Sequence, residues 1–380
     1  MELNNIRRNI DEIDTEIARL LCRRLDCSLK VADYKAANNI PVLNEQREKE
    51  ILNRIKGLCD GYKNGYGNAV LPVFAAMMDT SRALQHSRLG LGASFCAQVK
   101  SAKRELLPPD KARVVCQGVR GAYSEQAAAR LFDGAQPFFV DTFADVFAEV
   151  RDKNADYGIL PVENSTAGSV NEVYDLVMKY RFSIVAAITM PIEHCLLALP
   201  GASVDKLKVV YSHPQGLAQC AEAIAARNLE PRSFINTAAA ARMVSESGDY
   251  SICAIASRHA AEIYNLEILD NNIQTVEKNS TRFIAISREL IIPSEANKIS
   301  LIFALPHITG SLYRTLAQFA ATGLNLTKLE SRPSRIGTFE YVFYLDFEGG
   351  LSDASTLNLL CAMHEDMPMF SFLGNYREFE

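Results

Sequence analysis

Basic side chains interrupt an apolar helix face near the N-terminus. From Leu3 to Leu20 the apolar residues recur every three or four positions, and the same stripe then reaches Arg24 and Lys35, where leucines would be expected. A guanidinium among apolar side chains is costly unless an anion meets it. Two cations on one face therefore predict a site for a small anion, although Arg24 could instead reach the edge of the face and Lys35 could point into solvent.

Two polar pairs could complete this site. Ser81 and Gln85 are four residues apart in a predicted helix, and Asn44 and Glu48 have the same spacing. Residues at that spacing lie on one helix face, so each pair presents two polar groups in the same direction. Beside the two cations they would form a polar pocket.

Arg7 can reach that pocket only from another copy of the helix. It lies seventeen residues before Arg24, which at about 1.5 Å per residue is too far along the helix axis. The helical pattern continues to about Asn38, and so long a rod cannot bury its own apolar stripe. A homodimer or a higher homo-oligomer is therefore expected.

Three turns between buried strands and helical patterns carry a second kind of chemistry. They lie within 118–132, 161–177 and 211–224, and the last contains Ser212 and His213 before a proline. The free N–H groups at the start of a helix attract carboxylates. Each turn alone is also what an ordinary helix cap looks like.

A fourth stretch, NSTRF at 279–283, gathers Ser280, Thr281 and Arg282 at the start of a buried strand. With the three turns it predicts a cleft for a small polyanion. His213 is the only histidine in the turns, so a histidine-centred triad is not favoured. The sequence also has no metal-ligand spacing, so neither a metal nor a cofactor is expected.

Several kinds of element must position these residues. Residues 1–87 predict three helices, and 88–111 is typical of a linker. From 112 to 292 strands and helices alternate, which indicates an α/β domain with a largely parallel sheet. Residues 298–380 predict the order strand, helix, strand, strand, helix, strand of an α+β ferredoxin-like domain. The expected fold class is therefore multidomain, with an all-α, an α/β and an α+β part.

Composition narrows the function further. The chain has 380 residues, of which 48% are apolar and 22% charged, as in a protein with two or three globular domains. A net charge of −5 without a basic run does not support nucleic-acid or membrane-surface binding. No run approaches membrane-spanning length, no signal peptide is apparent, and nine cysteines are scattered without a CxxC. We therefore expect reduced thiols and a cytoplasmic location.

The helical region is similar along its whole length to the all-helical chorismate mutase family. The resemblance rests on IRRNIDEID, LCRRLD, VADYKAANNIPVLNEQREKEIL and SRALQ. The matching positions are Arg7, Arg24, Lys35, Arg47, Glu48, Ser81 and Gln85. The resemblance implies an intertwined dimer that rearranges chorismate to prephenate, with Arg7 donated by the other protomer.

This resemblance also implies how the cations act in a Claisen rearrangement. Arg7 and Arg24 would bind the two carboxylates of chorismate, as forked donors do best. Lys35 and Gln85 would hydrogen-bond the ether oxygen, where negative charge grows as the C–O bond breaks.

The remaining matching positions would hold the rest of the substrate. Glu48 would orient the ring hydroxyl, and Ser81 would assist a carboxylate. Asn44 stands where many relatives have an aspartate, so the resemblance implies weaker binding rather than lost activity.

The α/β region resembles the prephenate dehydratases. ILPVENSTAGSV, YSHPQGLAQC and NSTRF are similar to the family's signature stretches, while GVRG departs from the usual Gly-Pro-x-Gly. The resemblance implies two lobes, similar to those of a periplasmic binding protein, with the site in the cleft between them. Lobe 1 would comprise 112–189 and 281–292, and lobe 2 would comprise 190–280.

The dehydratase family converts prephenate to phenylpyruvate by loss of CO₂ and the ring hydroxyl. The resemblance implies that Thr281 donates a proton or a hydrogen bond to that hydroxyl, in surroundings that keep it dry and aligned. Six further residues would bind carboxylates or orient the hydroxyl, namely Asn164, Ser165, Thr166, Ser212, Gln215 and Arg282.

The C-terminal region is similar to the ACT domain that follows dehydratases. Gly310, Ser311 and Leu312 stand for the usual Gly-Ala-Leu, and Glu330, Ser331, Arg332 and Pro333 match intact. The resemblance implies that phenylalanine binds where two such domains pair and inhibits the enzyme. A module used only for dimerisation is the alternative.

In order along the chain, the three regions resemble the bifunctional chorismate mutase–prephenate dehydratases of phenylalanine biosynthesis. Chorismate and prephenate would be the substrates and phenylalanine the effector. Two alternatives stay open at this point. The helices could serve only for dimerisation of a dehydratase, or the whole chain could be a non-catalytic sensor of aromatic metabolites.

Overall fold

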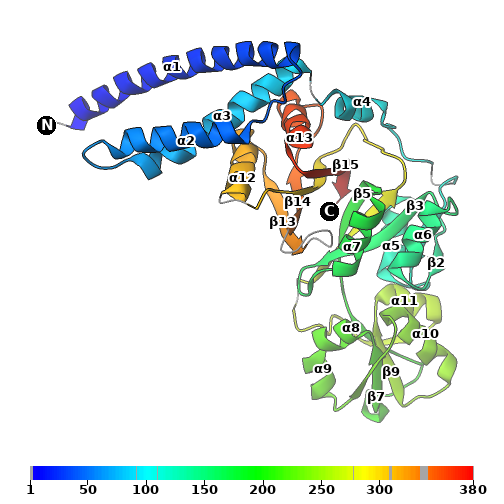
Figure 1. The fold of residues 1–380 in the computed structure, drawn as a ribbon. Helices are drawn as coiled ribbons and strands as arrows, with labels where there is room; N and C mark the ends of the chain where they lie inside the picture. The colour runs from blue at the N-terminus through cyan, green and yellow to red at the C-terminus, as the bar shows by residue number, and fades with distance from the viewer. Residues whose placement is uncertain are drawn as a thin grey trace. The chain divides into compact units, whose positions relative to one another are not determined.

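The chain forms two compact units in the computed structural model, which describes residues 3–90, 92–108, 110–276, 278–307, 310–333 and 341–379 (Figure 1). Unit 1 comprises Met1–Ser101 and Leu301–Ser371, and unit 2 comprises Ala102–Ser300 and Phe372–Glu380. The boundaries of the three domains expected from the sequence stay a prediction. Within the described residues, no helix is long and apolar enough to cross a membrane.

The N-terminal part of unit 1 is all-helical, as predicted. Its helices are α1 (Leu3–Ala37), α2 (Glu45–Asp60), α3 (Gly67–Leu89) and α4 (Ala93–Ser101). The side chain of Asn44 starts α2 by accepting a hydrogen bond from the N–H of Arg47 at 3.0 Å. Because α3 packs against both α1 and α2, residues of the three helices can share one site. The predicted linker contains α4, and its Leu91 and Pro109 lie outside the described residues.

The apolar stripe of α1 is exposed in the single chain. Leu3, Ile10, Ile13 and Leu20 keep 60%, 50%, 56% and 55% of their accessible surface. The sequence places apolar residues on this face at helical spacing, but among the described residues nothing covers them to the extent that a core would. The apolar face of α1, the long N-terminal helix drawn in blue in Figure 1, is therefore exposed.

The C-terminal part of unit 1, Leu301–Ser371, is called the C-terminal module here. The elements from residue 298 follow the predicted order, namely β12 (Lys298–Ala304), α12 (Ser311–Ala321), β13 (Leu326–Pro333), β14 (Tyr341–Glu348), α13 (Ala354–Asp366) and β15 (Met369–Phe379). The strands lie in the order β13-β14-β12-β15, and α13 packs against α3 and α4. Ile308, Thr309, Ser334 and Arg335, which belong to the stretch that carries the ACT resemblance, lie outside the described residues.

Unit 2 has two lobes, as the resemblance implied. The first is built on β1 (Val114–Gln117), β2 (Phe138–Val140), β3 (Tyr157–Asn164), β5 (Ser183–Pro191) and β11 (Ser280–Ser287), in the sheet order β5-β11-β3-β1-β2. The short β4 (Gly168–Ser169) pairs with β3, and the end of β15 pairs with β5. Helices α5 (Tyr123–Leu131), α6 (Phe143–Arg151) and α7 (Asn171–Tyr180) complete the lobe.

The second lobe contains a smaller sheet in the order β10-β6-β9-β7-β8. Its strands are β6 (Cys195–Ala198), β7 (Val209–Ser212), β8 (Glu230–Ser233), β9 (Ile252–Ala256) and β10 (Glu267–Asp270). Its helices are α8 (Pro214–Gln219), α9 (Ala221–Ala226), α10 (Thr237–Ser247) and α11 (Arg258–Tyr264). The chain leaves the first lobe after β5 and returns in β11, close to the predicted positions 190 and 280.

Both sheets are more mixed than the largely parallel sheet expected from the sequence. β1 runs parallel to β2 and β3, but β11 runs antiparallel to both β3 and β5. In the second lobe β6 runs antiparallel to β9 and β10. The returning strand accounts for the first departure, because β5 leads away from the lobe and β11 leads back into it.

Candidate active sites

Two cations of α1 are half-buried beside residues of α3 and the loop before α2. The Arg24 guanidinium donates through Nη1 to Oγ of Ser81 at 2.7 Å, and the Lys35 ammonium donates to the carbonyl of Val42. Burial lowers the pKa of both Arg24 and Lys35, and Glu48 opposes that shift. A partly desolvated cation attracts an anion more strongly than one in open water does. Arg24 and Lys35 are thus half-buried on α1, and their role in binding an anion stays a prediction.

The polar pair on α3 faces the same region. Ser81 and Gln85 are both buried, and Nε2 of Gln85 donates to the carbonyl of Ser81 at 3.2 Å. Within the described part of the chain, Oε1 of Gln85 has no hydrogen-bond partner. Buried polar atoms are nearly always paired, so this amide is a group that a ligand or a water would satisfy.

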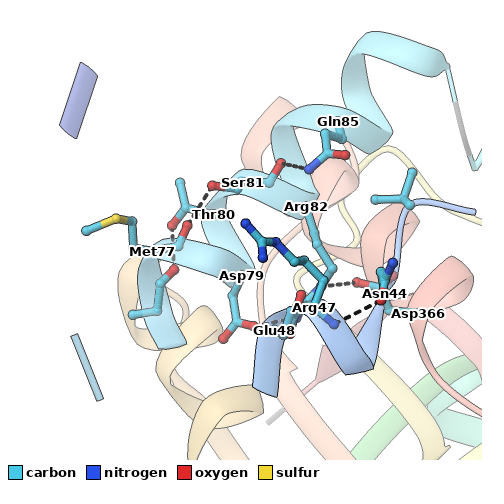
Figure 2. Close-up of polar contacts among 12 residues, drawn as sticks. Asn44, Arg47, Glu48, Met77, Asp79, Thr80, Ser81, Arg82, Gln85 and Asp366 are labelled. Carbon is cyan, nitrogen blue, oxygen red and sulfur yellow. Dashed lines mark hydrogen bonds and ion pairs between the residues drawn. The ribbon is translucent and has the colours of Figure 1, made fainter. Parts of the chain in front are cut away.

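Glu48 takes part in a cluster of charged residues that sequence reasoning missed (Figure 2). Its carboxylate accepts a hydrogen bond from Nη1 of Arg82 in α3, and Nη2 of Arg82 donates to Asp79. Nε of the same guanidinium lies 3.3 Å from Oδ2 of Asp366 in α13. The only signal in the sequence was that Asp79 and Arg82 share a helix face; the pairing with α2 and α13 is tertiary.

Three other predicted residues lie apart from the contacts of Arg24, Lys35 and Glu48. Asn44 is exposed, and its side chain caps α2. Arg47 is exposed and pairs with Glu50 at 3.1 Å. Arg7 is exposed on α1, and one chain does not bring it to Arg24, as the spacing predicted.

The second site centres on Thr281 at the start of β11. Its Oγ1 accepts a hydrogen bond from Nδ2 of Asn164 at 2.9 Å, and both residues are buried. Oδ1 of Asn164 accepts from the N–H groups of Thr166 and Ala167, at 3.1 and 3.0 Å. These contacts fix the amide so that its nitrogen points at Thr281. The Thr281 hydroxyl is held as an acceptor, and its own proton is left for another partner.

Thr281 and Asn164 lie in the wall of a cavity of about 360 Å³ in unit 2. Both lobes line it, with Phe283 and Ser124 from the first and His213, Gln215 and Gln219 from the second. Burial lowers the pKa of His213, so its ring favours the neutral form. The predicted cleft between two lobes is therefore present, and it has uncharged hydrogen-bonding groups around the threonine.

Arg282 does not face this cavity, contrary to the role expected for it. Its Nε pairs with Glu378 and its Nη2 donates to the Tyr376 hydroxyl at 2.7 Å, both in β15. Successive residues of a strand point to opposite faces of the sheet, so Thr281 and Arg282 cannot share one face. Here Arg282 joins two strands of unit 2.

Three other predicted residues also support the cavity rather than line it. Ser212 is fully buried and its hydroxyl donates to the Ile255 carbonyl at 2.7 Å, beneath α8. Ser165 accepts from the N–H of Ser280 at 2.9 Å, and Thr166 donates through Oγ1 to the Asn164 side chain at 2.7 Å. Of the residues whose hydroxyls were expected to contact substrate, Thr281 is the one that lines this cavity.

Gln219 is a cavity residue that the sequence reading did not select. Its Nε2 donates to Oγ1 of Thr166 at 2.8 Å, and its Oε1 lies 2.9 Å from Nε2 of His194. Burial lowers the pKa of His194, although the contact with Gln219 opposes the shift. A neutral His194 that donates to Gln219 would orient the amide toward Thr166 and Asn164. Its spacing of four residues from Gln215 in α8 was the available signal.

The residues predicted to sense phenylalanine lie on two elements of the C-terminal module. Gly310 precedes α12 with φ of 83°, a conformation that favours glycine, and Ser311 donates to the Pro306 carbonyl at 2.8 Å. Leu312 continues α12, whereas Glu330, Ser331, Arg332 and Pro333 end β13. Glu330 and Arg332 lie on the same face of β13, with Nη1 of Arg332 3.6 Å from Oε1 of Glu330.

Histidine, cysteine and acidic side chains do not gather into a potential metal site anywhere in the described ranges. The hydrogen-bonding groups described above are instead suited to organic acids, because they are cations, amides and hydroxyls.

Two family models match the chain. Residues 6–86 match chorismate mutase type II, and residues 114–290 match prephenate dehydratase. The first match contains the site of Arg24 and Lys35, and the second contains the cavity of Thr281.

Similar proteins agree with both matches. The chain is 34% identical over 379 residues to a bifunctional chorismate mutase/prephenate dehydratase of Aquifex aeolicus (strain VF5), covering 99% of this chain and 98% of that protein. It is 41% identical over 282 residues to arogenate dehydratase/prephenate dehydratase 6, chloroplastic, of Arabidopsis thaliana, covering 70% and 68% of the two chains. The crystal structure of prephenate dehydratase from Arthrobacter aurescens in complex with L-Phe has a TM-score of 0.64 and 28% identity, covering 70% and 89%.

Proposed function

Because the chain belongs to the family of bifunctional chorismate mutase/prephenate dehydratases, we propose that its two sites catalyse consecutive reactions. The helical site of unit 1 converts chorismate to prephenate. The cavity of unit 2 converts prephenate to phenylpyruvate, CO₂ and water. The product of the first reaction is the substrate of the second, and the chain is an enzyme of phenylalanine biosynthesis.

The mutase reaction needs positioning and electrostatic stabilisation rather than proton transfer. Arg24 binds one carboxylate of chorismate, and Lys35 and Gln85 hydrogen-bond the ether oxygen as the C–O bond breaks. This role is supported by the half-buried cations of α1 and by the buried Gln85 amide, which lies one turn after Ser81 on α3. Glu48 orients the ring hydroxyl, and Ser81 holds Arg24 in place.

A second copy of the chain completes the mutase site. Arg7 lies on the exposed stretch of α1, and the apolar stripe of that stretch is itself exposed. Burying the stripes of two α1 helices against each other or against α2 and α3 of the partner would remove this apolar surface from water. The partner's α1 would then bring a second arginine to the substrate. Homodimers or higher homo-oligomers are therefore the proposed active form.

The dehydratase reaction needs a group that assists departure of the ring hydroxyl. As the bond from the ring to its carboxylate breaks and releases CO₂, the electron pair forms the aromatic ring and the C–O bond breaks. Thr281 donates its hydrogen bond, or its proton, to the departing oxygen so that water leaves. The observation that carries this role is the hydrogen bond that Asn164 donates to Oγ1 of Thr281 inside the cavity. Because this oxygen already accepts a hydrogen bond, the hydroxyl proton of Thr281 can be donated to the substrate.

The other dehydratase residues divide into contacts and supports. Gln215 and Gln219 line the cavity and would hydrogen-bond the substrate. Ser165, Thr166 and Ser212 shape the turns around it. The name of the Arabidopsis relative contains both arogenate dehydratase and prephenate dehydratase. We propose prephenate because the mutase of the same chain supplies it.

The C-terminal module is proposed to be an ACT domain that binds phenylalanine. Support comes from its element order, from the GSL and ESRP residues, and from the complex of the Arthrobacter dehydratase with L-Phe. The contacting residues would be Gly310, Ser311, Leu312, Glu330, Ser331, Arg332 and Pro333. Phenylalanine would favour one arrangement of the enzyme and so inhibit it.

We also propose that residues 1–87, 112–292 and 298–380 act as mutase, dehydratase and regulatory domains, and that 88–111 links the first two. Nine free cysteines are compatible with a reducing compartment such as the cytoplasm.

Product analysis tests the proposed function. The full chain is incubated with chorismate, with and without phenylalanine, and prephenate and phenylpyruvate are quantified. We expect both products, and less of the second when phenylalanine is present. Formation of phenylpyruvate only from added prephenate would identify a dehydratase with helices that dimerise. Loss of neither substrate would identify a sensor without turnover.

A further inference from the structure

The guanidinium of Arg82 contacts three carboxylates from three different helices (Figure 2). Nη1 contacts Glu48 of α2, Nη2 contacts Asp79 of α3, and Nε lies 3.3 Å from Asp366 of α13. The side chain of Arg82 is only 13% exposed. All three of its nitrogens are therefore engaged, and the position of the guanidinium is fixed from three sides.

Glu48 is the carboxylate of this cluster that belongs to the proposed mutase site. Its side chain is 20% exposed and belongs to the proposed mutase site, where a displaced carboxylate would no longer meet the ring hydroxyl. Asp79 and Asp366 lie with Glu48 in the wall of one cavity of about 250 Å³. Burial raises the pKa of Asp79 in spite of Arg82, which shows how poorly this region solvates negative charge. Without Arg82, three neighbouring carboxylates would repel one another.

Asp366 ties the same guanidinium to the C-terminal module. It ends α13, and its other oxygen lies 3.3 Å from Nε2 of His86 in α3. His86 is buried and directly follows Gln85, the amide proposed to contact the ether oxygen. α13 thus contacts α3 at Arg82 and His86, which directly follow the proposed mutase residues Ser81 and Gln85. All of these contacts lie within unit 1.

We infer that Arg82 is a positioning residue for Glu48 in the mutase site, and that Asp366 makes this position depend on the C-terminal module. The inference rests on the proposed mutase role of Glu48. It gives the C-terminal module a direct route to the mutase that does not pass through unit 2. A change that moves α13 would release one of the three anchors of Arg82 and loosen Glu48.

Kinetics of the full chain test this inference. Arg82→Gln removes the charge and two of the three donor directions, Arg82→Lys keeps the charge, and Asp366→Asn removes only the anchor on α13. Arg88→Gln is the matched control, because Arg88 lies on the same helix in an exposed pair with Asp33 at 3.0 Å. Both kcat and KM for chorismate are measured; turnover of prephenate by the same preparation reports whether unit 2 is folded, and the helical signal in circular dichroism reports whether unit 1 is folded.

Arg82→Gln should raise the KM for chorismate about tenfold or more, because Glu48 contacts substrate before and during the reaction. Asp366→Asn should raise it by a smaller factor of roughly three, and Arg82→Lys should fall between wild type and Arg82→Gln. Prephenate turnover should stay unchanged in all of them, as should both activities of Arg88→Gln. Should Arg82→Gln also lose prephenate turnover, Asp366→Asn decides the question.

A Glu48→Gln background separates positioning from a general effect. There, Arg82→Gln should cause little further loss, because the residue it positions has already been changed. Equal losses in both backgrounds, or normal chorismate kinetics in Arg82→Gln and Asp366→Asn, would overturn the inference and leave the proposed function intact. No chorismate turnover by the unmodified chain would overturn the proposed mutase function, and this inference with it.

Discussion

The two sites solve different problems with different kinds of residue. The proposed mutase site in unit 1 consists of charged residues, namely Arg24, Lys35 and the Glu48–Arg82 pair. The cavity of unit 2 is built around a neutral chain of hydrogen bonds that ends on Thr281. A Claisen rearrangement develops charge on an ether oxygen and moves no proton, so fixed cations suffice. Loss of hydroxide needs one aligned donor, so an orienting network suffices.

The sites also differ in how complete one chain makes them. Asn164 already contacts Thr281, and both lobes of the same chain line the cavity. In the helical site Arg7 is distant from Arg24, the α1 stripe is exposed, and Asp366 comes from the C-terminal module. This difference supports the proposal that the first reaction depends on assembly of two chains and the second on the geometry within one chain.

The largest expected loss of activity tests the uncharged hydrogen bonds around Thr281 in unit 2. Thr281→Ala should lower prephenate turnover by about 10³-fold, since a positioned donor is lost, while chorismate turnover stays normal. Liquid chromatography of the products should show accumulated prephenate. Ser245→Ala, which removes an exposed hydroxyl of α10 that donates to the Arg242 carbonyl, is the control. Normal phenylpyruvate formation by Thr281→Ala would remove the assigned role.

In the proposed mutase site, a substitution should lower chorismate turnover and leave prephenate turnover unchanged. Arg24→Ala should lower chorismate turnover by about 10²-fold, because the carboxylate loses its forked donor and Ser81 its partner. Prephenate turnover should not change. The measurement is the decrease of chorismate absorbance. An unchanged rate would favour helices that serve only for dimerisation.

A smaller loss is expected for the residue that supports the threonine indirectly. Gln219→Ala should lower prephenate turnover by roughly tenfold, since Thr166 and His194 lose a hydrogen-bond partner each. Gln219→Glu adds a charge to the network and should be at least as slow. Steady-state kinetics check both, and wild-type rates would show that the amide is not part of the mechanism.

The smallest effect concerns Asn44. Aspartate caps a helix as well as asparagine does, so Asn44→Asp should leave α2 intact. If the carboxylate found in relatives improves contact with substrate, KM for chorismate should fall by roughly two- to threefold, as for other exposed polar contacts. A rise in KM would show that the cap, and not the substrate, determines this position.

The sequence predicted the elements better than the directions of their side chains. Hydrophobic spacing located α1 to within a residue, and the resemblance to the dehydratases implied crossings between the lobes near 190 and 280, where β5 ends and β11 begins. Arg282 was placed in the cavity although it follows Thr281 directly in a strand, and the alternation of a strand sends it to Glu378 instead. Ser212 was similarly taken for a contact residue, but the sheet buries it.

Pairings between distant segments could not be predicted. Arg82 meets Glu48 thirty-four residues away and Asp366 at a separation of 284, and no local pattern encodes either contact. Asp366 ends a helix whose register on α3 is set by packing of the C-terminal module. Gln219 could have been predicted from the sequence, because it lies one turn after Gln215 in a short helix that begins at Pro214.

Subunit mixing tests the central claim most directly, namely that two chains complete the mutase site and one chain completes the dehydratase site. Arg7→Ala and Arg24→Ala chains are each expected to have little chorismate turnover and normal prephenate turnover. If the two are combined so that subunits exchange at random, half of the dimers are mixed and one of their two sites is intact, so about a quarter of the normal rate should return. A mixture no more active than the average of its parts would contradict the claim.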